Sequence, residues 1–135
     1  MDKIKVCSFN CKGFYSSQLE LLELCKCHNI ICLQEIWLDK VELQNLNTFH
    51  PSFCGFGVSP VDPSAGLIRG RKYGGVAFLW DKVREENVYP IDFGYDWIAG
   101  IRLMRGKTVI NLIGVYMPCD SKHNIDSFLV CFGVL

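Results

Sequence analysis

ICLQEIWLD, residues 31–39, runs from apolar residues into a glutamine and a glutamate before it returns to isoleucine, tryptophan and leucine. An ionised carboxylate beside a buried apolar run costs free energy unless something pairs with it. Glu35 is therefore either a rim carboxylate paired with a nearby lysine or the ligand of a cation. The elements on both sides of this stretch decide where in the fold it lies.

A strand, a helix and a second strand are predicted around the stretch. Residues 4–10, IKVCSFN, are β-branched and aromatic and are followed by turn residues, as in a buried strand. Ser17 and Glu20 form a capping box ahead of an apolar stripe that predicts a helix over 18–28. Residues 30–34 form the second strand, and a crossover of this length requires the two strands to be parallel if they share a sheet.

This arrangement brings polar residues of the two strands together. The carboxyl ends of parallel neighbours lie at the same edge of a sheet, so Asn10 and Glu35 are expected roughly 5 Å apart across the ladder spacing. Ligands of α/β proteins favour that edge. Glu35 is thus a candidate site residue, and a rim carboxylate with a lysine partner remains the alternative.

The remainder of the chain predicts a loop, a strand and a hairpin. Residues 51–71 are dense in proline, glycine and serine and lack a period, which favours a long surface loop. VAFLW at 76–80 is typical of a buried strand, and residues 97–103 and 108–116 are predicted to be the arms of a hairpin. Tyr116 then lies near the carboxyl end of the second arm.

Three basic residues, Arg69, Arg71 and Lys72, stand just before the Gly74-Gly75 pair, where the chain re-enters the sheet. Such a cluster suits phosphate contacts, and a solvated basic loop is an equally common arrangement. Net charge does not decide between them, because 14 basic residues balance 14 acidic ones. Binding of a polyanion would therefore depend on a local patch such as this one.

The eight cysteines are interpreted as free thiols in a reducing compartment. The chain opens MDKIKV without an apolar signal segment and carries no N-x-S/T site, which predicts an intracellular location, nuclear or cytoplasmic. The longest apolar runs fall short of the ~20 residues that a membrane helix needs. No membrane partner is expected.

Four stretches of the chain can be compared together: SFNCKG with Asn10, LQEIWL with Glu35, YGGVAFLW from Tyr73, and GVYMPCD with Tyr116. In this order they resemble the endonuclease/exonuclease/phosphatase superfamily of metal-dependent phosphodiesterases. QEIW together with the Y-x-P-C stretch is most similar to the endonuclease domains of non-LTR retrotransposons. The resemblance covers residues 4 to about 120. It implies an α/β (α+β) fold, the amino-terminal half of a four-layered sandwich with a mixed sheet and a flanking helix.

The resemblance also implies roles for single residues. Glu35 matches the metal-binding glutamate and would hold Mg²⁺, a hard cation that prefers oxygen ligands. Asn10 matches an asparagine that supports the metal and nucleophile side of the site, and Tyr116 matches a tyrosine whose hydroxyl reaches the scissile phosphate. A tyrosine packed at a strand end is the alternative for Tyr116. Gln34 and Trp37 are interpreted as scaffold.

The sequence departs from the family pattern at its carboxyl-terminal end. The family's second half carries a D-x-N pair and a terminal D-H pair, and neither is present. Asp120, His123 and Asp126 precede any further predicted strand and are not assigned to those roles. Residues 1–135 are therefore expected to be a partial domain, truncated before its second half.

Three functions remain open from the sequence. The first is a Mg²⁺-dependent phosphodiesterase, an endonuclease that acts on nucleic acid and above all on DNA. It would belong to a longer protein such as a retrotransposon polyprotein with reverse transcriptase. The fragment alone is expected to be inactive. The second is a non-catalytic remnant or interaction module that self-associates through an uncovered apolar face. The third, a small nucleotide-binding protein, rests on residues 106–108, whose glycine spacing and context differ from those of a phosphate-binding loop.

Overall fold

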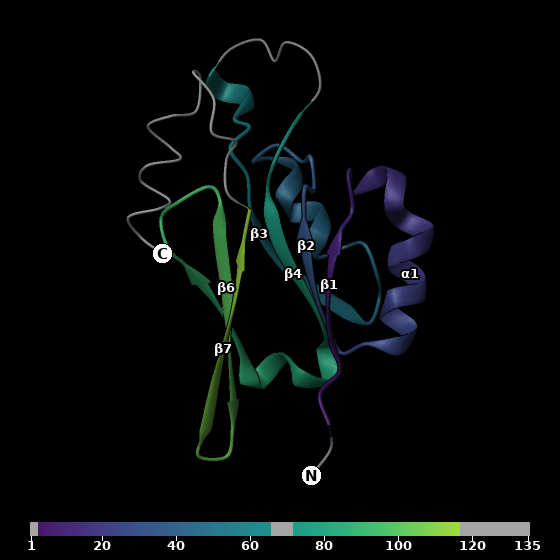
Figure 1. The fold of residues 1–135 in the computed structure, drawn as a ribbon, viewed down its shortest axis with the longest axis vertical. Helices are drawn as coiled ribbons and strands as arrows, with labels where there is room; N and C mark the ends of the chain where they lie inside the picture. Colours follow the sequence, from purple (N-terminus) through teal and green to yellow (C-terminus); the bar gives the residue numbers. More distant parts are fainter. Residues whose placement is uncertain (1–2, 66–71, 117–135) are drawn as a thin grey trace.

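The computed structural model describes residues 3–65 and 72–116 of the chain (Figure 1). This part contains one α-helix, seven strands and four short 3₁₀ helices. The helix and strands are, in chain order, β1 (Val6–Asn10), α1 (Gln18–Cys27), β2 (Ile30–Gln34), β3 (Phe53–Val58), β4 (Val76–Asp81), β5 (Val88–Asp92), β6 (Ile98–Arg105) and β7 (Thr108–Val115).

The first sheet is mixed and has the strand order β1-β2-β4-β3. β1 and β2 are parallel, with Asn10 opposite Gln34, which confirms the prediction from the crossover length. β4 runs antiparallel to β2 and β3, so that Val76 lies opposite both Gln34 and Val58. The carboxyl ends of β1, β2 and β3 therefore meet the beginning of β4 at one edge of the sheet.

The sheet is covered on both faces. Figure 1 shows α1 beside β1 and β2, on the side away from β6 and β7. Leu21 of α1 packs there against Ile31 and Leu33 of β2. On the other face, Ile30 and Phe78 pack against Ile101 of the second sheet, which is antiparallel and has the order β5-β6-β7.

The described residues thus form three of the four predicted layers: the helix with its loops, the mixed sheet and the antiparallel sheet. They contain no second α-helix from which a fourth layer could be built. No helix in this part of the chain is long and apolar enough to cross a membrane.

Several predicted elements are confirmed. The second strand coincides with β2, residues 76–80 lie in β4, and the two hairpin arms are β6 and β7. The helix ends one residue earlier than predicted, with His28 as its C-cap. The capping box is wrong: Ser17 is the N-cap residue, but its side chain makes no capping hydrogen bond. The Ser17 hydroxyl is buried and donates instead to the carbonyl of Cys11, which ties the helix to the end of β1.

The predicted loop over residues 51–71 is wrong in part, because β3 lies within it. Gly55 and Gly57 are strand residues here, and both contact Leu46 of the preceding 3₁₀ helix. A Cβ at either position would stand 2.7–2.8 Å from the Leu46 side chain, so close packing requires glycine. The glycines that suggested a loop are therefore residues of a strand that packs closely against Leu46. β5, which the sequence analysis did not predict, accommodates Pro90 because it is an edge strand of the second sheet.

An open cleft lies on the side of the sandwich where β1 and β7 run. Within the described residues, β1 pairs only with β2, and β7 pairs only with β6. The cleft between these edges has a volume of about 590 Å³ and is lined by residues of β1, β2, β4 and β7. Val6 and Ile113 at its margin are 45% and 55% exposed. Within the described residues, both strand edges on this side of the sandwich are thus open.

Candidate active site at the carboxyl edge of the mixed sheet

The chain segments that follow β1 and β2 remain hydrogen-bonded beyond the strands. The N–H of Cys11 donates to Gln34 O at 3.0 Å, and the N–H of Gly13 donates to Glu35 O at 2.9 Å. The N–H of Trp37 then donates to the carbonyl of Gly74 at 3.0 Å. The backbone around Glu35 is therefore held on one side by the segment after β1 and on the other by the segment before β4.

Glu35 and Trp37 have left-handed backbone conformations, with φ of +53° and +55°. A residue with a Cβ in this region costs on the order of 1–3 kcal/mol and persists only when its surroundings determine it. The turn places Ile36 and Leu38 fully in the core while the Glu35 side chain stays half-buried at the rim. Gly75, at φ +93°, allows this turn, because a Cβ there would stand 2.5 Å from Ile36 Cγ1.

Tyr116 reaches Glu35 from the second sheet. The Tyr116 hydroxyl donates to Glu35 Oε1 at 3.1 Å, and the Tyr116 N–H donates to Trp97 O at 3.1 Å. Tyr116 follows β7 directly and packs against the core between the sheets. The structure therefore brings together two of the three residues that the sequence analysis assigned to catalysis.

Asn10, the third predicted catalytic residue, is exposed at the end of β1. It lies opposite Gln34 in the ladder of β1 and β2, so it is next to Glu35 along the sheet edge. The Gln34 amide donates to Ser8 Oγ at 3.0 Å and to Cys32 Sγ at 3.3 Å, as a scaffold residue would. The role of Asn10 stays a prediction.

The ion pairs of the described residues involve other carboxylates, and none includes Glu35. The alternative of a rim glutamate paired with a lysine therefore has no support in this part of the chain. A carboxylate has about four lone-pair sites, and the Tyr116 hydroxyl occupies one of them. Glu35 consequently retains capacity to bind a cation.

Glu35 offers a single carboxylate, which fits the sparse protein ligand set of a Mg²⁺ site. No group of three or more His, Cys, Asp or Glu side chains in residues 3–65 and 72–116 could hold a metal ion. Mg²⁺ usually keeps several waters and is bound by one or two carboxylates together with substrate phosphates. Glu35 supplies one carboxylate at an exposed edge, which meets that minimum.

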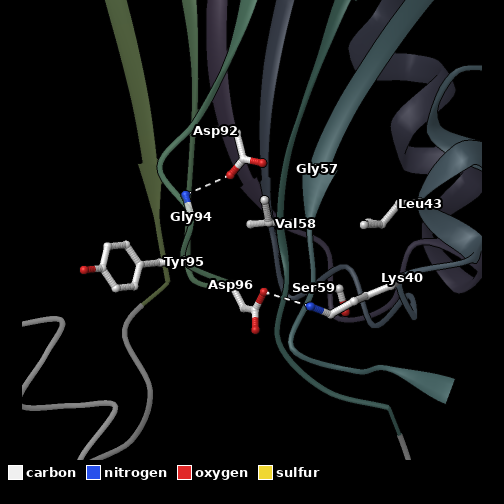
Figure 2. Close-up of a pocket in the computed structure, with 9 residues that line it drawn as sticks. All are labelled: Lys40, Leu43, Gly57, Val58, Ser59, Asp92, Gly94, Tyr95 and Asp96. Carbon is white, nitrogen blue, oxygen red and sulfur yellow. Dashed lines mark hydrogen bonds and ion pairs between the residues drawn. The ribbon is translucent and has the colours of Figure 1, made fainter. Parts of the chain in front are cut away.

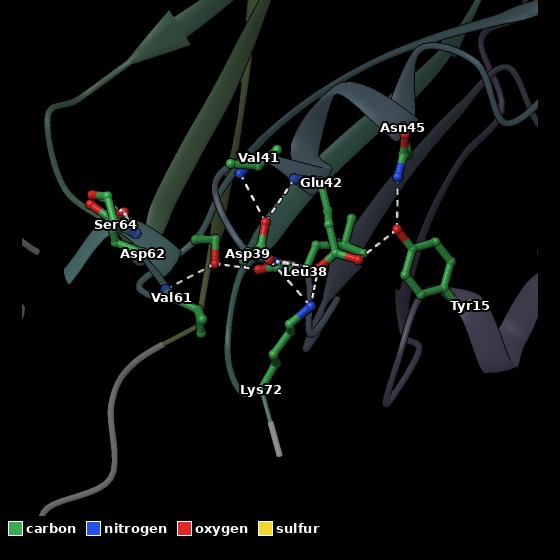
Figure 3. A network of polar contacts seen from close by, with 11 residues as sticks. Tyr15, Leu38, Asp39, Val41, Glu42, Asn45, Val61, Asp62, Ser64 and Lys72 are labelled. Atoms are coloured by element: carbon green, nitrogen blue, oxygen red, sulfur yellow. Dashed lines mark hydrogen bonds and ion pairs between the residues drawn. The ribbon is translucent and has the colours of Figure 1, made fainter. Parts of the chain in front are cut away.

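Lys72 takes part in a polar network beside this edge (Figure 3). Its ammonium lies 3.2 Å from Asp39 Oδ2 and also contacts Glu42 Oε1, and this hydrogen bond to Glu42 is the main reason that the pKa of Lys72 is raised. Burial acts to raise the pKa of Asp39, but the Glu42 backbone N–H and the Lys72 ammonium outweigh it and hold that pKa below its usual value. The network fixes the chain just before Gly74, whose carbonyl holds Trp37.

Lys72 is thus engaged by two carboxylates, and a phosphate would have to compete with them. Phosphate contact by Lys72 stays a prediction. Arg69 and Arg71, predicted to bind substrate with it, lie outside the described residues.

Sequence reasoning missed two features of this region. The first is the capping role of Asp39, the last residue of the ICLQEIWLD stretch. Its Oδ1 accepts hydrogen bonds from the N–H groups of Val41 and Glu42 at 2.9 and 2.8 Å. The D-x-x-E spacing of Asp39 and Glu42 can signal such a cap.

The second is an aromatic pair: Trp97 precedes β6 and forms a ring pair with Tyr95. This pair depends on the conformation of a short loop, for which the sequence offers no periodic signal.

The fold is that of hydrolases of the nuclease and phosphatase class. A model of the Endonuclease/Exonuclease/phosphatase family matches residues 7–128, and the chain belongs to this family. No curated protein matches the chain.

Solved structures share the fold at low sequence identity. The AP endonuclease LMAP from Leishmania major is 13% identical, with a TM-score of 0.66 over 96% of this chain and 45% of that one. The 3' phosphatase NExo from Neisseria, bound to a product DNA hairpin, is 16% identical, with a TM-score of 0.57 over 93% and 47%. The endonuclease domain of TRAS1, a telomere-specific non-LTR retrotransposon, is 14% identical, with a TM-score of 0.56 over 98% and 52%. The chain spans about half the length of these structures.

Replacing Glu35 by glycine and by alanine separates its backbone conformation from its side chain. Both variants lose the carboxylate, but only glycine adopts φ near +53° without a Cβ penalty. We expect Glu35→Gly to be more stable than Glu35→Ala by about 1 kcal/mol in free energy of unfolding, measured with urea. At Glu23, exposed in the middle of α1, the same pair should show the opposite order, alanine being favoured by about 1 kcal/mol. An alanine variant at position 35 as stable as the glycine variant would contradict the left-handed turn.

Proposed function

We propose that the chain supplies the metal-binding half of a Mg²⁺-dependent phosphodiesterase, an endonuclease that acts on nucleic acid as part of a longer protein. The observation that carries this proposal is the 3.1 Å hydrogen bond between Tyr116 and Glu35. It joins the residue that resembles the family's metal ligand to the residue that resembles its phosphate contact. The two come from different sheets, so their meeting depends on the whole sandwich.

The chemistry proposed for each residue follows from its position. Glu35 presents a carboxylate at an exposed edge and would hold the cation. Mg²⁺, when bound, polarises a phosphoryl oxygen as a Lewis acid. Tyr116 has one O–H to donate, so it donates either to Glu35, as in the structure, or to a phosphate oxygen on which charge develops. Asn10, at the end of the neighbouring strand, would bind the attacking water or a phosphate oxygen through its amide.

No histidine among the described residues lies at the edge that carries Glu35. Phosphodiester hydrolysis needs a positioned water and a base or anion that orients it. His28 and His50 precede β2 and β3, which begin at the edge of the sheet opposite Glu35. We therefore propose that these groups come from a further part of the protein, since the chain spans only about half of the solved structures that it resembles.

DNA is the substrate that we favour. The NExo structure is bound to a product DNA hairpin, and TRAS1 is a non-LTR retrotransposon. The QEIW and Y-x-P-C stretches are those that resemble retrotransposon endonucleases. A retrotransposon polyprotein is accordingly the context proposed for the chain, with Arg69 and Arg71 as further phosphate contacts.

Plasmid nicking tests this function. We expect the 135-residue chain alone to leave supercoiled plasmid intact in Mg²⁺, and the same chain extended by a second half of the family type to nick it. Glu35→Ala in the extended protein should reduce the rate by orders of magnitude, because loss of a metal ligand removes several kcal/mol of transition-state stabilisation. Glu23→Ala, on the exposed face of α1, is the matched control and should retain activity. Strong nicking by the short chain that disappears with Glu35→Ala would refute the proposal of a divided site.

A second candidate function, a non-catalytic module that self-associates, is favoured by the cleft between β1 and β7. Its two margins are strand edges with exposed apolar side chains, and such edges promote pairing with other chains. A second copy of the chain is the occupant proposed for this cleft, because the chain has no net charge to oppose association.

Sedimentation velocity over a range of concentrations tests self-association through this cleft. We expect the purified chain to form larger species as concentration rises, and Val6→Lys with Ile113→Lys to shift it toward monomer, since lysine protects exposed strand edges. Leu19→Lys on α1, where the leucine is 78% exposed, should not change the distribution. A monomer at all concentrations would rule out this module.

A further inference from the structure

The loop that joins β5 to β6 is held in place at the edge where the candidate site lies. Asp92 Oδ1 accepts the N–H of Gly94 at 2.8 Å, and Gly94 has a φ of +80°. Asp96 Oδ1 lies 3.2 Å from Lys40 Nζ, on the segment that follows Glu35 (Figure 2). Two separate contacts thus fix the loop on either side of Tyr95.

Tyr95 and Trp97 form an aromatic pair on this loop. Their ring centroids are 5.0 Å apart and their planes differ by 33°. Tyr95 is 39% exposed, Trp97 is partly buried, and neither belongs to the two core clusters. Figure 2 shows the Tyr95 ring directed away from Val58. The pair therefore presents aromatic surface that the packing of the two sheets does not use.

The aromatic pair adjoins the residue proposed to contact phosphate. Trp97 O accepts the Tyr116 N–H, which extends the ladder of β6 and β7 by one position beyond Ile98 and Val115. Residues directly opposite in an antiparallel ladder have their side chains on the same face, about 5 Å apart. Trp97 and Tyr116 consequently share the face from which Tyr116 reaches Glu35.

The pocket beside this loop suits phosphate poorly. It has a volume of about 290 Å³, lies between the loop and β3, and is lined by Tyr95 itself together with the carboxylates of Asp92 and Asp96. The charge of Lys40, which also lines it, is paired with Asp96. Anionic groups are therefore disfavoured in this pocket, whereas the aromatic pair is uncharged and open.

We propose that Tyr95 and Trp97 form a stacking platform for an unpaired nucleobase beside the scissile phosphate. This inference rests on the proposed function, because it assumes a nucleic-acid substrate at Glu35 and Tyr116. Every base has a π-face that stacks on an aromatic ring, so the platform is tolerant of sequence. Bases inside a duplex are already stacked on their neighbours, so the platform selects single-stranded or locally unpaired nucleotides.

Binding of two strands that differ only in their bases tests the platform. Fluorescence anisotropy with the 135-residue chain in EDTA would compare a labelled single-stranded oligonucleotide with a strand of the same length composed of abasic sites. We expect Tyr95→Ala to weaken binding of the first strand by about 5- to 150-fold, the change that corresponds to the loss of one base–aromatic stack, and to leave the abasic strand unaffected. Tyr95→Phe should bind as the unaltered chain does. Tyr89→Ala, which removes a tyrosine that is 50% exposed on β5, is the matched control and should have no effect.

Three results would overturn the platform: an unchanged affinity in Tyr95→Ala, an equal loss on both strands, or no binding of the single strand by the unaltered chain. The proposed function is judged separately by the dependence of plasmid nicking on Glu35. If Tyr95 supports base-dependent binding but the extended protein does not nick plasmid, the platform stands and the proposed metal site is wrong.

Discussion

The hydrogen bond from the Gly13 N–H to Glu35 O is the constraint on which the site depends. Together with the bond from Trp37 N–H to Gly74 O, it holds the chain in a left-handed turn just after β2. The turn costs on the order of 1–3 kcal/mol at each such residue. Burial of Ile36 and Leu38, at roughly 1.5–3 kcal/mol each, offsets that cost. The turn thereby holds the Glu35 carboxylate at the rim, beside the buried side chains of Ile36 and Leu38.

The second requirement is that two sheets meet correctly. Glu35 belongs to the mixed sheet and Tyr116 to the antiparallel one, and the core between the sheets sets their separation. Gly114 shows how tight this packing is, because a Cβ there would stand 2.7 Å from Cys32 Sγ. The Lys72 network acts at a third point, where it anchors the segment that carries Gly74. The contact between Glu35 and Tyr116 therefore depends on the packing of both sheets.

Much of this could be predicted from sequence because it follows from local periodicity. The parallel pair β1 and β2, the helix and the hairpin follow from apolar patterns and a crossover length, and they place Glu35 at the sheet edge. β3 was not predicted, because its glycines Gly55 and Gly57 are required by close packing against Leu46, a contact that the composition does not reveal. The partners of Lys72, the buried bond of Ser17 and the ring pair of Tyr95 depend on tertiary contacts between segments that are not related by any period. The roles of Asn10, Arg69 and Arg71 stay predictions.

We propose that the left-handed turn places the Glu35 carboxylate, as a cation ligand, at the shared edge of the two sheets. A titration of the full chain with Mg²⁺, followed by backbone amide NMR, tests it most directly. We expect weak binding, with a millimolar or weaker dissociation constant, because Mg²⁺ exchanges its waters reluctantly for a single carboxylate. The amides that shift should be those around Asn10, Glu35 and Tyr116, and Glu35→Gln should abolish the shifts. Tight binding that survives Glu35→Gln, or shifts centred on Asp39 and Glu42, would contradict the assignment of Glu35 as the Mg²⁺ ligand.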